Sequence, residues 1–317
     1  IKEGLNLMAE HGQNVGSALK VEVSDAARQG MAKAMAVWDE KTQNGTAQLD
    51  EQALHQELRG YLKPLVLLTE QYPAVAANPP YASSGNINKS LKSYLKEHYP
   101  RAKKDLFATF MEVFPDLTWE RGRLAFITPP SWMFLSSYED LRTHYIDDYF
   151  FESLLHLSRG IFGADFGSVA TAVQKAEQNR RTGTYFRLIE RTFQEFNVEH
   201  LHELFLRAME DPDFHYDFSQ YEKDGSIPNV SDPRGQRLYY PRIDQREFLK
   251  IPSSPIAYWA SERVVEVFNY YTLLGEYGKV REGIHTGKNK LFLRNWQEVD
   301  IKKFSVEEVS YDSIEEN

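Results

Sequence analysis

Apolar and polar positions follow a helical period in the first third of the chain. Residues 24–42 form a tract rich in Ala, Met and Lys, and Ser24 stands where an N-cap is expected. Leu54, Leu58 and Leu62 recur every four positions and mark the face of a second helix. Pro64 follows directly, so this helix is expected to end or kink there, and the next one can start at the proline.

Further along, strand-like runs alternate with helical ones. The run 74–77 predicts a short strand and the run 123–128 a buried strand, which two prolines stop. A stripe at 106, 107, 110, 113 and 114 predicts a helix that starts at Asp105, and Ser136 with Glu139 predicts a capping box for another. Strand-like runs follow at 153–157, 169–174 and 184–190. This order predicts an α/β fold, with a parallel sheet and an antiparallel edge.

The texture of the sequence changes after residue 190. Residues 191–250 are rich in charged and aromatic side chains and in loop signals, which predicts a connector that wraps the core. A new segment begins near residue 251, with a helix around 261–271 and a glycine-punctuated stretch at 275–287. We therefore expect a core at 1–190, a connector at 191–250 and the beginning of a second domain at 251–317. The chain starts at Ile1 without a Met, which suggests a fragment of a longer protein.

Composition narrows the class of protein. Of 317 residues 42% are apolar, enough for a packed core, and no apolar run approaches the roughly 20 residues of a membrane span. There are no cysteines, so neither disulfides nor a thiolate zinc site is expected, and a reducing cytoplasm fits. The net charge of −9 argues against a protein that is basic all over, although a local basic stripe could still bind nucleic acid.

Several familiar motifs fail on spacing. Gly160, Gly163 and Gly167 do not form G-x-G-x-x-G and are expected in a loop between strands. The stretch 283–289 has three residues between its glycines where a P-loop has four, and an asparagine where Ser or Thr must bind Mg²⁺. His200, His202 and Glu203 lack the spacing of a zinc protease and are expected on a solvated helix face, so no metal site is predicted.

The stretch Asn78-Pro79-Pro80-Tyr81 carries the clearest chemistry. It follows the strand-like run 74–77, and its two prolines fix the backbone and offer no N–H donor. The side-chain oxygen of Asn78 and the main-chain oxygen of Pro79 could accept both hydrogens of a planar amine, which frees the nitrogen lone pair to attack a methyl group. Tyr81 offers a flat face on which a heterocycle can stack. Such a rigid turn suits a preorganised site.

This tetrad resembles the catalytic N-P-P-Y of adenine-N6 DNA methyltransferases, and protein glutamine methyltransferases share it. Residues 77–142, beginning ANPPYASSGN, are similar to the PglX methyltransferases of BREX phage-defence systems and to related restriction–modification enzymes. Residues 274–300, beginning LGEYGKVREG, are similar to the segment that opens their target-recognition domain. The resemblance implies a partial Rossmann-like class I methyltransferase sheet, S-adenosylmethionine as cofactor and double-stranded DNA as substrate.

The resemblance also assigns roles to residues outside the tetrad. It implies Phe162, with Phe166 as competitor, as the aromatic that faces Tyr81 across a flipped adenine. It implies that Asp105, Leu106 and Phe107 line the cofactor pocket. The family's glycine-rich cofactor loop should precede the tetrad, but no such loop is found between residues 1 and 77. The main grip on the cofactor is therefore expected upstream, and residues 1–317 alone are expected to be inactive.

Basic side chains cluster directly after the tetrad. Between residues 86 and 104 the only acid is Glu97, against six basic residues: Lys89, Lys92, Lys96, Arg101, Lys103 and Lys104. They could contact DNA phosphates beside the flipped base, or they could form an ordinary solvated helix face. Weaker candidates in the second domain are Arg281, Lys288, Lys290 and Arg294.

The resemblance implies a site-specific DNA adenine-N6 methyltransferase that marks host DNA in phage defence or restriction–modification. An adenine inside a duplex must be extruded to reach the tetrad. Other defence-system proteins are possible partners. Two alternatives stay open: a protein glutamine methyltransferase, which would explain the tetrad alone, and a non-catalytic DNA-binding or assembly subunit, which the missing cofactor loop would explain.

Overall fold

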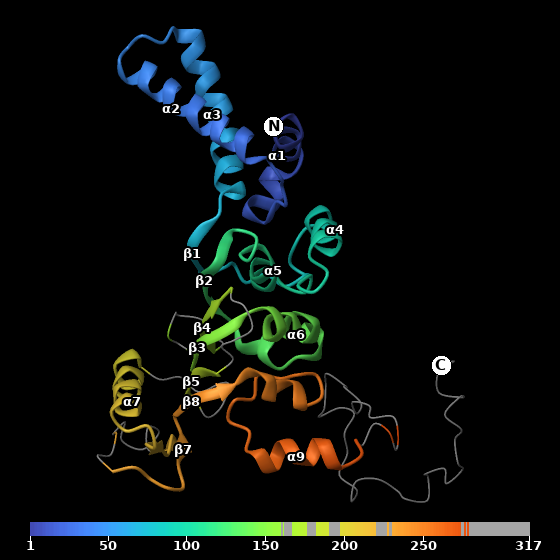
Figure 1. The fold of residues 1–317 in the computed structure, drawn as a ribbon, viewed down its shortest axis with the longest axis vertical. Coiled ribbons are helices and arrows are strands. Elements are labelled where there is room, and N and C mark those ends of the chain that lie inside the picture. The colour runs from blue at the N-terminus through green and yellow to red at the C-terminus, as the bar shows by residue number, and fades with distance from the viewer. Residues whose placement is uncertain are drawn as a thin grey trace, which may run out of the picture. The chain divides into compact units, whose positions relative to one another are not determined.

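The computed structural model divides the chain into two compact units, residues 1–270 and 271–317. Figure 1 shows the fold of the first unit, in which helices alternate along the chain with the strands of a mixed sheet. The structure describes residues 1–159, 161, 167–175, 182–189, 197–219, 227, 230–273, 276 and 278. The predicted core, connector and second-domain boundaries stay predictions.

The chain begins with a helical region, coloured blue in Figure 1. It contains α1 (Lys2–Val15), a short 3₁₀ turn η1 (Gly16–Ala18), α2 (Asp25–Gln43) and α3 (Leu49–Thr69). The Ser24 side chain accepts from the Ala27 N–H and caps α2, as predicted. Pro64 was expected to end or kink the second helix; it does not end it, because α3 continues through it to Thr69.

A six-stranded sheet forms the centre of the fold, with the order β1-β2-β4-β3-β5-β8. The pairs β1–β2 and β3–β5 are parallel, and the other three pairs are antiparallel. The α/β prediction is therefore confirmed, with β8 as an antiparallel edge strand. The sequence did not predict that β4 would lie antiparallel inside the sheet. The strands are β1 (Tyr72–Ala77), β2 (Thr118–Thr128), β3 (Phe150–Leu157), β4 (Ser168–Gln174), β5 (Thr182–Leu188) and β8 (Tyr239–Asp244).

Helices and short turns connect and cover these strands. They are α4 (Lys89–His98), α5 (Leu106–Val113), η2 (Pro130–Met133), η3 (Ser136–Tyr138), α6 (Glu139–Asp148), α7 (Val198–Glu210), η4 (Gln245–Lys250) and α9 (Glu262–Tyr270). A separate two-stranded sheet pairs β6 (His215–Tyr216) with β7 (Gln236–Arg237). The main core gathers side chains from α4, α5, α6 and the sheet, while α7 packs with β5 in a second cluster.

Two local predictions in this region were wrong. Ser136 and Glu139 form no capping box: Ser136 begins η3, Glu139 is the first residue of α6, and the N-cap residue Tyr138 makes no side-chain capping bond. His200 does not lie on a solvated face. It is buried at 7% exposure, and its ring Nε2 lies 3.1 Å from the Tyr216 hydroxyl.

Arg142 is a fully buried cation in α6. Its guanidinium donates to the carbonyl of Trp132 at 2.7 Å and to that of Leu135 at 2.6 Å, both in the segment after β2. It also donates to the carbonyls of Ser254, at 3.0 Å, and Ser253. Burial lowers the pKa of Arg142. The side chain therefore joins the segment after β2 to a turn more than a hundred residues later.

Candidate active site

The tetrad Asn78-Pro79-Pro80-Tyr81 lies where the carboxyl end of β1 leaves the sheet. The last parallel pair joins Ala77 to Phe126 of β2, and the next residue is Asn78. Pro79 is buried, whereas the Asn78 side chain is exposed and Tyr81 is half-buried. The carboxyl edge of an α/β sheet is where such folds bind ligands. The structure thus brings the predicted amine acceptor to the edge where the predicted chemistry needs it.

The Tyr81 hydroxyl connects the tetrad to the neighbouring strand. Its oxygen lies 2.8 Å from Asn78 Oδ1 and 3.0 Å from the main-chain oxygen of Ile127 in β2. Its ring makes a T-shaped contact with the Phe107 ring, at a centroid distance of 6.3 Å and an interplanar angle of 87°. Burial raises the pKa of Tyr81, so the hydroxyl keeps its proton at neutral pH. The ring and hydroxyl are therefore both held in place.

Asp105 joins the tetrad segment to α5. One carboxylate oxygen, Oδ1, accepts the N–H of Ala82 at 3.0 Å and the N–H of Phe107 at 3.3 Å. It is the N-cap of α5, at the residue where the sequence predicted that the helix starts. Burial raises the pKa of Asp105, and backbone donors including those of Phe107 and Ala82 oppose that rise. A role in cofactor binding stays a prediction, since the observed contacts of Oδ1 are structural.

Three of the predicted basic residues share one face of α4. Lys89, Lys92 and Lys96 are spaced by three and four positions, which places them side by side on a helix, and all three are exposed. The helix is capped by Asn88, whose side-chain oxygen accepts the Leu91 N–H at 2.8 Å. The opposite face carries the buried residues of α4, so the lysines point away from the core.

The other basic residues lie closer to the tetrad. Lys103 and Lys104 are exposed, and the Ser84 N–H donates to the Lys104 carbonyl at 2.9 Å. The chain just after Tyr81 thus runs beside the end of the basic run. Arg101 is less available for a phosphate, because its guanidinium lies 3.1 Å from the Glu112 carboxylate. The remaining predicted residues lie outside the described part of the chain: Phe162, its competitor Phe166, Arg281, Lys288, Lys290 and Arg294.

A second group at the carboxyl edge was not predicted. His156, near the end of β3, is 8% exposed, and its ring centroid lies 6.1 Å from that of Phe134 and 6.3 Å from that of Trp259. The Arg187 guanidinium lies 4.5 Å from the centre of the Trp259 ring. Burial lowers the pKa of His156 to about 4, and the charge of Arg187 acts in the same direction. His156 is therefore a neutral side chain at physiological pH.

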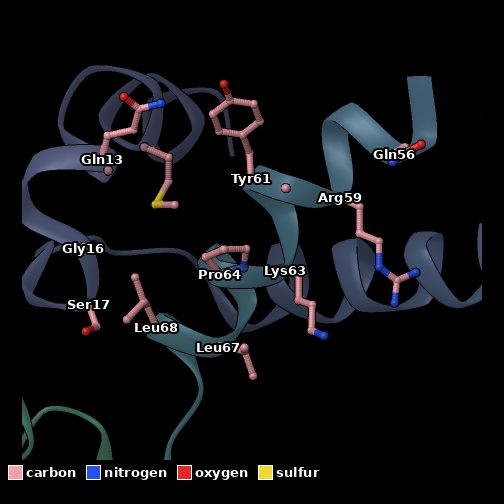
Figure 2. Close-up of a pocket in the computed structure, with 13 residues that line it drawn as sticks. Gln13, Gly16, Ser17, Gln56, Arg59, Tyr61, Lys63, Pro64, Leu67 and Leu68 are labelled. Carbon is pink, nitrogen blue, oxygen red and sulfur yellow. The ribbon is translucent and has the colours of Figure 1, made fainter. Parts of the chain in front are cut away.

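A groove lies elsewhere, between α1 and α3 (Figure 2). Its volume is about 1060 Å³, and its apolar lining includes Met8, Pro64, Leu67 and Leu68. None of its lining residues belongs to the tetrad or to the basic run. The groove is therefore not where the tetrad would act.

The described residues offer only part of a cofactor site. From residue 1 to β1 the ordered elements are three α-helices and one 3₁₀ turn, so no strand precedes β1 to carry a phosphate- or cofactor-binding loop. In the same described part of the chain, no three His, Cys, Asp or Glu side chains are grouped to hold a metal. Nor is any described helix long and apolar enough to span a membrane.

Part of the chain matches a known protein family, and most of it aligns with two curated proteins. Residues 13–162 match the family model described as Eco57I restriction-modification methylase. The chain is also 35% identical, over 266 residues, to the adenine-specific methyltransferase PglX of Lacticaseibacillus casei (strain Zhang), an alignment that covers 82% of this chain and 20% of PglX. It is 32% identical, over 249 residues, to the adenine-specific methyltransferase BrxX of Escherichia coli O9:H4 (strain HS), covering 78% of this chain and 18% of BrxX.

The PglX resemblance predicted from residues 77–142 is thus confirmed, and the chain spans about a fifth of the length of these two relatives. The partial class I methyltransferase sheet expected with it agrees with the mixed α/β sheet. A solved structure, the M protein of the type I restriction enzyme EcoKI, is 18% identical with a TM-score of 0.38, covering 63% of this chain and 46% of that one. A likeness at that TM-score adds nothing to the assignment.

Proposed function

We propose that the protein to which this chain belongs transfers a methyl group from S-adenosylmethionine to N6 of adenine in a specific double-stranded DNA site. The observation that carries this proposal is the exposed amide of Asn78 beside Tyr81 at the carboxyl end of β1. PglX and BrxX, its relatives, bear the name of adenine-specific methyltransferases. Marking host DNA as self in a phage-defence or restriction–modification system is the role we propose for the reaction.

The proposed chemistry uses few side chains. The target adenine leaves the duplex and stacks on Tyr81, and its amine donates one hydrogen to the Asn78 side-chain oxygen and the other to the Pro79 carbonyl. These acceptors localise the nitrogen lone pair and hold the developing positive charge. S-adenosylmethionine, when bound, supplies a methyl group on a sulfonium, which is a good leaving group. With the cofactor bound, the new N–CH₃ bond would form as the S–CH₃ bond breaks and leaves a neutral thioether, and the amine would then lose one proton to solvent.

The described residues fit one end of that cofactor. Asn78 would lie beside the reacting methyl group, and the Asp105 turn would form a wall of the pocket. A strand with a cofactor-binding loop before β1, which would hold the rest, is not present in residues 1–71. Other defence-system proteins are proposed partners, and the cytoplasm is the proposed location.

Asn78→Ala in the full-length protein tests the proposal. We expect it to abolish adenine methylation without unfolding the protein, because it removes an amine acceptor from an exposed position. Sequencing that detects methylated bases in host DNA gives the readout. Asn86→Ala, at another exposed asparagine of the same segment, is the matched control and should methylate normally. Methylation of the same sites by Asn78→Ala would disprove the assignment, and methylation of a protein glutamine instead would favour the alternative substrate.

The lysine face of α4 tests the DNA interaction separately. Replacing Lys89, Lys92 and Lys96 with Ala should weaken duplex binding. It should also reduce the slope of log K against log salt concentration by about 0.9 for each phosphate that the protein no longer neutralises. The control replaces three exposed lysines elsewhere in the chain, which changes the net charge equally: Lys2, Lys33 and Lys63. Binding measured at several salt concentrations decides it. Equal salt slopes for both triple variants would mean that the α4 lysines form an ordinary solvated helix face and do not contact DNA phosphates.

A further inference from the structure

The Tyr81 hydroxyl has one proton but two oxygen neighbours that both act as acceptors. It lies 2.8 Å from Asn78 Oδ1 and 3.0 Å from the carbonyl oxygen of Ile127. A hydroxyl donates one hydrogen bond at a time and can accept two. When it donates to Asn78, the Ile127 carbonyl receives no hydrogen bond from it. When it donates to Ile127, the end of the Asn78 amide that faces Tyr81 must itself be a donor.

The second arrangement requires only a half-turn of the Asn78 amide, whose two ends have nearly the same shape. The NH₂ end then donates to the Tyr81 oxygen, and the Tyr81 hydroxyl donates to Ile127. Every group in this series of hydrogen bonds has a partner, and the series has one more hydrogen bond than the first arrangement. The Asn78 oxygen now points away from Tyr81, toward the exposed side of the residue, where an incoming amine would need an acceptor.

We propose that Tyr81 acts as a positioning residue: through its hydroxyl and the Ile127 carbonyl, it sets the Asn78 amide with the oxygen toward the target amine. This inference rests on the proposed function and assigns Tyr81 a second task beside stacking. In the other setting, with the hydroxyl donating to Asn78 Oδ1, the acceptor oxygen is already engaged. The two settings differ by one rotation of the amide and one of the hydroxyl.

The surroundings of Tyr81 hold its hydroxyl at the required place. Its ring packs edge-on against Phe107, which is 1% exposed at the start of α5. The next residue, Ala82, donates its N–H to Asp105, which also caps α5. Ile127 lies in β2, between β1 and β4, so its carbonyl is part of the sheet backbone. Pro79 and Pro80 have no N–H, so neither can turn the amide by donating to it.

Tyr81→Phe in the full-length enzyme separates the two tasks, because phenylalanine keeps the stacking face and loses only the hydroxyl. The substrate is a duplex oligonucleotide that carries a site methylated in the parent strain, and the readouts are the single-turnover methylation rate and the DNA dissociation constant. We expect the rate to fall at least threefold while the dissociation constant stays within twofold. Tyr81→Ala, which also loses the ring, should weaken DNA binding as well.

A second background distinguishes positioning from a general structural effect. The carboxylate of Asn78→Asp has two equal oxygens, so it has no orientation to select. In that background the additional change Tyr81→Phe should cost less than half the factor it costs in the parent. An equal cost in both backgrounds would overturn the positioning role, as would Tyr81→Phe methylating at the parent rate. If Asn78→Ala itself retains methylation, the proposed function fails first; if it is inactive and Tyr81→Phe is unimpaired, only this inference fails.

Discussion

His156 should make the folded chain lose stability in mild acid. It is buried between Phe134 and Trp259, and burial together with the charge of Arg187 lowers the pKa of His156 to about 4. Among the described residues its Nδ1 has no hydrogen-bond partner, so no contact there stabilises a protonated ring. Replacing it with an apolar residue of similar size, His156→Leu, removes the titrating group and keeps the site filled.

The sign and size follow from linkage. The pKa of the folded His156 lies below that of an unfolded histidine, about 6.5, so the unfolded chain binds the proton first as the pH falls. Stability is therefore complete above pH of about 6.5 and is lost progressively down to a pH of about 4. With these two pKa values, the free energy of unfolding falls by about 2 kcal/mol between pH 7.5 and pH 5.

Urea unfolding at pH 7.5 and at pH 5, followed by tryptophan fluorescence, measures this loss for the parent and for His156→Leu. The parent should lose about 2 kcal/mol more than the variant over that interval. His202→Gln, at an exposed histidine of α7, is the control and should behave like the parent. If the parent and His156→Leu lose the same free energy, the histidine is not held neutral by its burial and the reasoning is refuted.

Two further changes test the packing that supports the site, both by thermal or urea unfolding. Gly183→Ala would place a Cβ 2.1 Å from the Phe151 carbonyl oxygen on the paired strand and should destabilise the protein by about 2 kcal/mol or more. Its control, Gly60→Ala, places a Cβ with nothing within 4 Å and should stabilise the protein by about 0.5–1 kcal/mol. Equal effects of the two changes would contradict the close approach of the two strands. Arg142→Met should lower the free energy of unfolding by about 3 kcal/mol or more, because it leaves buried carbonyls without donors. Its control, Arg246→Met, removes an exposed ion pair and should change stability little. A well-folded Arg142→Met protein with the stability of the parent would contradict this account.

Local patterns predicted the elements that depend on neighbouring residues. Ser24 caps α2 and Asp105 caps α5, because a cap needs only the next few backbone N–H groups. Pro64 misled the prediction: a proline disfavours a helix locally, but Leu62 and Leu65 on either side of it are buried in a common cluster, and this packing holds α3 together. His200 was expected in solvent because its partner Tyr216 lies sixteen positions further along the chain.

The same division applies to the candidate site. The tetrad was visible in the sequence because its chemistry lies in four consecutive residues. The Ile127 carbonyl could not be predicted from the sequence, since every residue has a main-chain oxygen. It lies in the site only because β2 pairs with β1. The position of β4 between β2 and β3 was equally hidden, because strand order depends on interactions between distant segments. Sequence periodicity assigns a strand its faces but not its neighbours.

The buried Arg142 has a consequence for how the protein is made. Two of its carbonyl partners, Trp132 and Leu135, lie ten and seven residues before it, but Ser253 lies 111 residues later. At about 5–20 residues per second, the ribosome needs roughly 6–20 s to supply that turn. Until then the segment after β2, at the edge that carries the tetrad, is not joined through Arg142 to the carbonyls of Ser253 and Ser254. We therefore expect this edge to become protease-resistant only when Ser254 has been synthesised and has left the ribosome, so that nascent chains stalled before that point are cleaved near residues 130–135 and longer ones are not.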